Sequence, residues 1–158
     1  MTFLQQLVHQ LLAGLLALAP GQPAGASAVL HDWDDRRAAA WAAGDPVALG
    51  SLYAARASAG RADVAMLRAW RARGLRVRGM RMQLLDLEVR RATATRLDLV
   101  VTDRLAGAVA RGPGVRLPLP EAGASTRRVL LVRSGSTWRV AQASAVRTTS
   151  WTVRSRKE

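Results

Sequence analysis

The sequence of 158 residues contains no cysteine, one lysine and two histidines. Without cysteine there is no disulfide framework, no thiolate metal site and no cysteine nucleophile. The two histidines, His9 and His31, offer no basis for a zinc cage or a histidine-based catalytic triad. We therefore expect neither a metal nor a cofactor.

Aromatic residues and acidic residues are also scarce: there is one Phe, one Tyr and five Trp, and 24 basic residues face 11 acidic ones, for a net charge of +13. The whole excess lies in residues 63–158. Such an excess suggests a polyanion partner such as nucleic acid, an anionic membrane surface or a wall polymer. GC-rich codons would equally produce a chain rich in Arg, Ala and Gly, so the composition leaves both explanations open.

Residues 1–28 contain no Arg or Lys and combine the apolar run LLAGLLALA with Pro20, Pro23 and a small-residue stretch that ends at Ala28. This pattern predicts a signal peptide cleaved after Ala28, and hence an extracytoplasmic or secreted protein. The apolar run is shorter than the ~20 residues that span a bilayer. The basic n-region of a signal peptide is missing, so an amphipathic leader helix on a membrane or partner, or a disordered leader of a cytoplasmic protein, are the alternatives.

Residues 29–147 read as one α+β domain that begins with three helices. A helix over 30–43 carries Trp33 and Trp41 two turns apart. Asp45 and Pro46 form an N-cap followed by Pro at the first helical position, which predicts a short helix ending near Tyr53. Asp63 directly precedes a run with helical spacing, so we expect it to cap a third helix that ends at Gly74.

The rest of the domain is predicted to be β-structure. Residues 75–91 and 95–105 alternate apolar and polar positions. In the first of these strands the apolar residues change from odd to even positions between Val77 and Met80, and back to odd positions at Leu85. Such parity slips predict bulges that bend the sheet. Opposite charges favour a register with Arg90 beside Asp98 or Glu88 beside Arg96. Residues 111–125, rich in Gly and Pro, read as a loop or a ragged edge strand. A hairpin of strands 127–133 and 138–147 follows. Residues 148–158 form a basic tail, in which Trp151 is either exposed to a membrane interface or partner or folded back on the sheet.

Two stretches resemble a known superfamily. The residues WAAGDP at 41–46, followed by Leu49, Leu52 and Tyr53, resemble the first helix pair of nuclear-transport-factor-2-like proteins, which include SnoaL-like and ketosteroid-isomerase-like proteins. The closing VLLVRSGSTWRV resembles their last hairpin. The resemblance implies a cone, in which three N-terminal helices pack on a strongly curved antiparallel sheet of four or more strands and leave a pocket. It implies a fold and no particular activity.

Asp103 is the foremost candidate for chemistry, because alternation places it on the apolar face with Leu97, Leu99 and Val101. A carboxylate in an apolar pocket suits proton abstraction next to a carbonyl, with Tyr53 as a hydrogen-bond donor. An ion pair of Asp103 with an arginine and a core position for Tyr53 are the structural alternatives. Residues expected to line the pocket or core are Trp33, Trp41, Trp70, Leu99, Val101 and Trp138.

These observations favour a non-catalytic binding or interaction module over an enzyme. Its partner would be a protein, a small apolar ligand, or a second copy that pairs through the sheet. An isomerase-like or cyclase-like enzyme using Asp103 as base and an Arg-rich polyanion binder are the alternatives.

Overall fold

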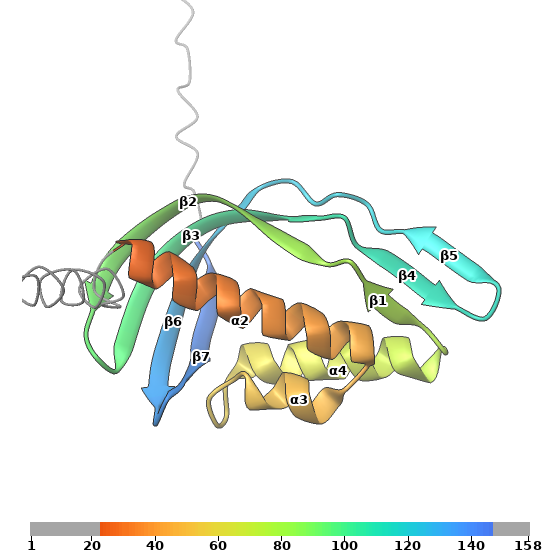
Figure 1. Ribbon diagram of the computed structural model, residues 1–158, viewed down its shortest axis with the longest axis horizontal. Helices are drawn as coiled ribbons and strands as arrows, with labels where there is room; N and C mark the ends of the chain where they lie inside the picture. The colour runs from red at the N-terminus through yellow and green to blue at the C-terminus, as the bar shows by residue number, and fades with distance from the viewer. Residues whose placement is uncertain (1–22, 147–158) are drawn as a thin grey trace, which may run out of the picture.

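The computed structural model describes residues 23–146, which form three helices and two antiparallel sheets (Figure 1). The predicted basic tail with Trp151 and most of the predicted leader lie outside these residues. The helices are α2 (Pro23–Ala43), α3 (Pro46–Ser51) and α4 (Ser58–Ala72). The larger sheet has the order β2-β3-β6-β7 and the smaller one β1-β4-β5. None of the described helices is both long enough and apolar enough to cross a membrane.

Helix α2 begins seven residues earlier than the sequence predicts, at Pro23 instead of Leu30. Ala26, in this added part, is fully buried in the core. A cleavage after Ala28 would therefore remove the first six residues of α2, and this cleavage stays a prediction. At the other end of the helix, the predicted cap of α3 is confirmed, because the Asp45 carboxylate accepts hydrogen bonds from the amides of Val47 and Ala48 at 2.9 and 3.0 Å.

The prediction that Asp63 caps the third helix is wrong. Helix α4 starts at Ser58, so Asp63 lies inside the helix and is buried. The sequence suggests a loop here because Ser58 and Gly60 are poor helix formers. Gly60 has a packing role instead: a Cβ at this position would lie 2.6 Å from the Tyr53 ring. The glycine allows α4 to approach Tyr53 closely, and this contact outweighs its low helix propensity.

One of the two predicted bulges is confirmed within β2 (Arg81–Ala92), which pairs with β3 (Arg96–Ala106). One register shift falls at Leu85, at the predicted parity slip, and a second one at Arg90. The second bulge places Asp98 opposite Arg91, so neither of the two predicted charge pairings forms across these strands.

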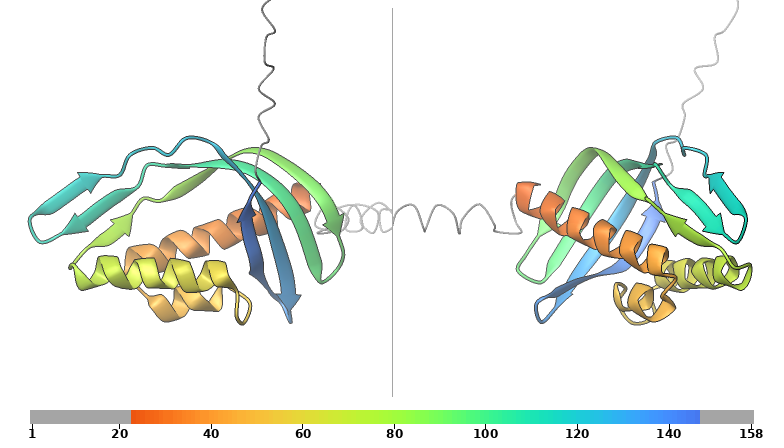
Figure 2. Two further views of the ribbon diagram at one scale, coloured as in Figure 1. Left: turned by 180° about the vertical axis from the view of Figure 1, so that it is seen from behind. Right: turned by 45° about the vertical axis from the view of Figure 1, so that its right-hand side comes forward.

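The first parity slip separates β1 (Arg76–Arg78) from β2. Gly79 at this break and Gly107, between β3 and β4 (Val109–Gly112), both have positive φ angles of 69° and 71°. A Cβ on Gly79 would lie 3.0 Å from the carbonyl oxygen of Gly107, so both strands bend at neighbouring points. These kinks turn the small sheet away from the large one, and together the sheets curve over α2 (Figure 2).

The C-terminal part follows the prediction. Strand β5 (Val115–Pro118) is an exposed edge strand beside β4, as the Gly-rich and Pro-rich segment indicates. Strands β6 (Ser125–Ser134) and β7 (Thr137–Ala145) form the expected hairpin. The predicted core residues Trp33, Trp41, Trp138, Leu99 and Val101 are buried, and Trp70 is half-buried. A curved sheet therefore covers the helices and buries most of these tryptophans.

Candidate functional site

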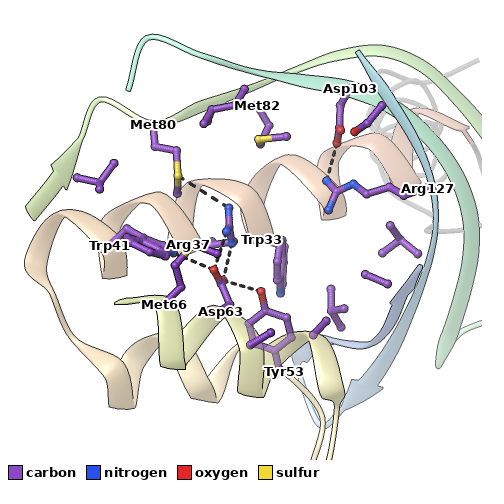
Figure 3. Close-up of a pocket in the computed structure, with 18 of the residues that line it drawn as sticks. Trp33, Arg37, Trp41, Tyr53, Asp63, Met66, Met80, Met82, Asp103 and Arg127 are labelled. Carbon is purple, nitrogen blue, oxygen red and sulfur yellow. Dashed lines mark hydrogen bonds and ion pairs between the residues drawn. The ribbon is translucent and has the colours of Figure 1, made fainter. Parts of the chain in front are cut away.

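The concave face of the sheet and the helices line a partly open cavity of about 480 Å³ (Figure 3). Its wall is mostly apolar, and two arginines, two aspartates and one tyrosine are the main polar groups. The residues that line it include Trp33, Arg37, Trp41, Tyr53, Asp63, Met66, Trp70, Met80, Met82, Asp103, Arg127 and Ala143.

One face of α2 supplies a wall of the cavity. Leu30, Trp33, Arg37 and Trp41 recur at helical spacing, so their side chains project from a single stripe. The Trp33 indole N–H donates to the carbonyl of Leu52 at 2.8 Å. Its ring meets the Tyr53 ring edge-to-face, with centroids 5.3 Å apart. These contacts fix the aromatic part of the wall.

Asp63 is the centre of a buried hydrogen-bond network. Its carboxylate accepts two bonds from Arg37, at 2.6 Å from Nε and 2.7 Å from Nη2. It accepts further bonds from the Tyr53 hydroxyl at 2.7 Å and from the Trp41 indole N–H at 3.2 Å. The network joins α2, the segment after α3, and α4. Four donors on one carboxylate compensate for its burial.

The network also shifts ionisation equilibria. Burial and the negative charge of Asp63 raise the pKa of Tyr53 well above its usual value, so the phenol stays protonated. Burial alone would lower the pKa of Arg37, but its hydrogen bonds and charge interaction with Asp63 outweigh burial and raise that pKa. Arg37 therefore remains a cation.

A second ion pair lies on the sheet side of the cavity. Asp103 is 1% exposed, and its Oδ2 accepts a hydrogen bond from Arg127 Nη2 at 2.5 Å. The ion pair that the sequence offered as an alternative for Asp103 therefore forms. Asp103 Oδ1 and Arg127 Nε are buried and have no hydrogen-bond partner among the described residues. They leave one acceptor and one donor free beside the cavity.

Asp34, on α2, lies near this pair and is 9% exposed. Its pKa is raised to about 6, chiefly by burial; the charge of Asp103 contributes to the rise, and the charges of Arg127, Arg37 and His31 oppose it. Its Oδ1 atom has no hydrogen-bond partner within residues 23–146. Asp34 thus changes its charge close to neutral pH. In the same part of the chain, no three His, Asp or Glu side chains gather closely enough to hold a metal ion.

The structure brings several predicted residues to the cavity. Asp103, Tyr53, Trp33, Trp41 and Trp70 line it, whereas Leu99, Val101 and Trp138 belong to the packed core. Sequence reasoning missed the three partners Arg37, Asp63 and Arg127. The sequence contains a signal for two of them. Arg37 lies midway between Trp33 and Trp41 on the same helical stripe, and Arg127 alternates with Val129 and Leu131, so it lies on the same face of its strand.

The sequence matches no family model and no curated protein. The structure is similar to the intermembrane-space region of the chloroplast protein ARC6, with 16% identity and a TM-score of 0.53, over 80% of this chain and 98% of that one. It is also similar to Aln2 from a Streptomyces species, with 16% identity and a TM-score of 0.52, over 78% and 90% of the two chains.

A protein of the NTF2-like family from Streptomyces avermitilis also matches, with 16% identity and a TM-score of 0.49, over 80% of this chain and all of that one. Within residues 23–146, three helices precede antiparallel sheets that curve strongly and do not close. The α+β cone that the resemblance implies is therefore confirmed, with helices packed on a strongly curved antiparallel sheet. Identities this low establish the fold alone, and function must be argued from the cavity.

Proposed function

We propose that this chain is a non-catalytic binding module whose cavity takes a small, mostly apolar ligand. A cavity of about 480 Å³ lies within the size range of small-molecule sites. Its lining combines the aromatic rings of Trp33, Trp41 and Trp70 with the flexible thioethers of Met66, Met80 and Met82. Methionine side chains adapt to ligands of irregular shape, which suits an apolar guest.

The polar groups favour binding over catalysis, and this observation carries the proposal. Both carboxylates that line the cavity are already paired with arginines, Asp63 with Arg37 and Asp103 with Arg127. Each would have to give up that pair to abstract a proton. The Tyr53 hydroxyl donates to Asp63 and would have to leave it to stabilise an oxyanion. The pairs instead keep the cavity close to neutral.

The proposal is tested by titrating the protein with a neutral fluorescent apolar probe such as N-phenyl-1-naphthylamine. We expect a single site with a Kd of about 10 to 100 μM, a range consistent with a small ligand of modest efficiency. Ala143 lines the cavity on β7, and Ser144 beside it is exposed on the opposite face of the strand. Ala143→Phe should abolish probe binding, while Ser144→Phe should retain it. Equal binding by both variants would place the probe elsewhere.

A second candidate function is an isomerase-like or cyclase-like enzyme with Asp103 as the base and Tyr53 as the donor. One observation favours it: the Oδ1 atom of Asp103 is buried beside the cavity and free of hydrogen bonds among the described residues. Asp103→Asn should then abolish turnover of a carbonyl-containing ligand found in a binding screen, while its Kd changes little. Unchanged ligand chemistry in Asp103→Asn would remove this candidate.

We also propose that the module acts outside the cytoplasm, on the basis of the apolar and uncharged segment that precedes the domain. Fusing residues 1–28 to a reporter that is active only after export tests this location. An inactive fusion, beside an active control with an established signal peptide, would contradict it.

A further inference from the structure

A row of arginines crosses the small sheet. Arg76 on β1 pairs with Arg111 on β4, and Arg111 pairs with Arg116 on β5, so three like charges lie directly opposite one another. Like charges in this position destabilise a sheet. Charged side chains on an edge strand prevent aggregation, which accounts for Arg116. Arg111 lies on the central strand of the three, where that explanation does not apply.

No acidic residue offsets this row in the sequence around it. Residues 64–85 contain six Arg and no Asp or Glu, and residues 104–120 contain three Arg and no Asp or Glu. Arg71 donates to the carbonyl of Gly44 at 3.5 Å, near the C-terminus of α2, which gives it a structural role. Arg78, Arg111 and Arg116 are exposed, and within residues 23–146 their side chains form no hydrogen bond or ion pair.

The arginines share one face. Val77 and Ala110 pair with each other and are buried, so their neighbours Arg76, Arg78 and Arg111 point to the outer side of the small sheet. A shallow depression there is lined by Arg71, Gly74, Arg76, Arg78, Arg111 and Gly112. The β4–β5 hairpin extends beyond the helices at one end of the molecule (Figure 1), so the surface is accessible.

The same hairpin exposes aliphatic side chains. Val115 and Leu117, on the face of β5 opposite Arg116, are 44% and 56% exposed. Between Trp70 and Trp138 the sequence contains no aromatic residue, so the hairpin offers no ring on which a base could stack. These aliphatic side chains lie on the other face of the hairpin and take no part in a surface formed by the arginines. An unpaired arginine row without stacking rings fits an anionic membrane surface, where cations meet lipid phosphates.

We propose that the outer face of the β1-β4-β5 sheet, with its hairpin tip, is a docking surface for membranes that contain anionic lipids. Arg76, Arg78, Arg111 and Arg116, which share this face, contact the phosphates. This surface lies outside the ligand cavity, so membrane docking and ligand binding are separate properties of the chain.

The test measures sedimentation of the full chain with phosphatidylcholine vesicles that contain about 30% phosphatidylglycerol, in about 0.1 M salt. Pure phosphatidylcholine vesicles give the background from the apolar N-terminal segment. The variant Arg78→Gln/Arg111→Gln/Arg116→Gln should lose about 100-fold in partitioning, because each arginine near an anionic surface contributes a factor of about five.

The matched control is Arg61→Gln/Arg91→Gln/Arg96→Gln, which removes three charges away from the small sheet. We expect its partitioning to fall less than about threefold, since charges more than about 10 Å from the surface are screened. If the triple docking variant unfolds, Arg111→Gln alone should still lose about fivefold.

Two results would overturn the proposal. One is an equal loss in the docking and control variants, or equal binding to neutral and anionic vesicles. The other is tighter binding of the protein to a DNA duplex than to the vesicles at the same salt, together with loss of this DNA binding in the docking variant. The surface would then be a nucleic-acid-binding site.

Discussion

Asp34 makes the stability of this domain depend on pH in a direction that can be stated in advance. The carboxyl is 9% exposed, its Oδ1 has no hydrogen-bond partner among the described residues, and its pKa rises from 3.8 to about 6, chiefly through burial. The unfolded chain therefore ionises Asp34 at lower pH than the folded chain. Below about pH 4 both states hold the proton and the residue costs nothing. Above about pH 6 the folded state carries a charge that it solvates poorly.

The magnitude follows from the shift. A change of about two pKa units corresponds to ~3 kcal/mol in the free energy of unfolding. Asp34→Asn removes the charge and keeps the shape, so the variant should be more stable than the wild type by ~3 kcal/mol near pH 8 and equal to it near pH 4. In a domain of this size that gain raises the Tm by about 10 °C.

Urea unfolding followed by Trp fluorescence, at intervals across that pH range, measures the difference directly. Asp35→Asn is the matched control, because Asp35 is the neighbouring residue and is exposed. We expect it to stay within about 0.5 kcal/mol of the wild type throughout. A stability difference for Asp34→Asn that is the same near pH 4 and pH 8, or a loss of stability near pH 8, would refute the reasoning.

Three further predictions concern other contacts. Asp63→Asn leaves the buried Arg37 cation without its partner, so it should cost ~3 to 5 kcal/mol in the free energy of unfolding, whereas Asp98→Asn should cost under ~1 kcal/mol, because its partner Arg128 is 60% exposed. Equal losses of unfolding free energy in Asp63→Asn and Asp98→Asn, measured by chemical denaturation, would contradict this difference. Gly60→Ala places a Cβ against Tyr53 and should cost ~1 to 3 kcal/mol, while Gly123→Ala, which meets no atom within 4 Å, should be neutral. Edman sequencing of the exported protein should find Val29 at the N-terminus if cleavage follows Ala28, and a start before Pro23 would show that α2 is retained whole.

Local rules predicted much of the fold. Alternation along residues 95–105 placed Asp103 on the inner face, and the Asp45-Pro46 pair marked the start of α3, because both signals depend only on neighbouring residues. The parity slip near Leu85 also revealed a bulge. The bulge at Arg90 was not predicted, because the apolar residues around it keep the same alternation. This bulge places Asp98 opposite Arg91 and not opposite Arg90.

The polar contacts in the cavity could not be predicted from the sequence, because they join segments that are far apart in the chain. Asp63 reaches Arg37 only because α4 starts at Ser58 and approaches Tyr53 through Gly60. Arg127 reaches Asp103 only because the register between β3 and β6 places Val101 opposite Arg127 and Asp103 opposite Ser125. The connection from β5 to β6 carries no pattern that would set this register.

The central claim is that an apolar ligand occupies the cavity between the helices and the curved sheet, and NMR of the tryptophan indole N–H groups tests it most directly. Trp33, Trp41 and Trp70 line the cavity, whereas Trp138 lies in the packed core on β7. On addition of the neutral apolar probe, the account predicts saturable shifts of the Trp33, Trp41 and Trp70 signals and little change at Trp138. Probe binding that leaves those three signals in place would contradict it.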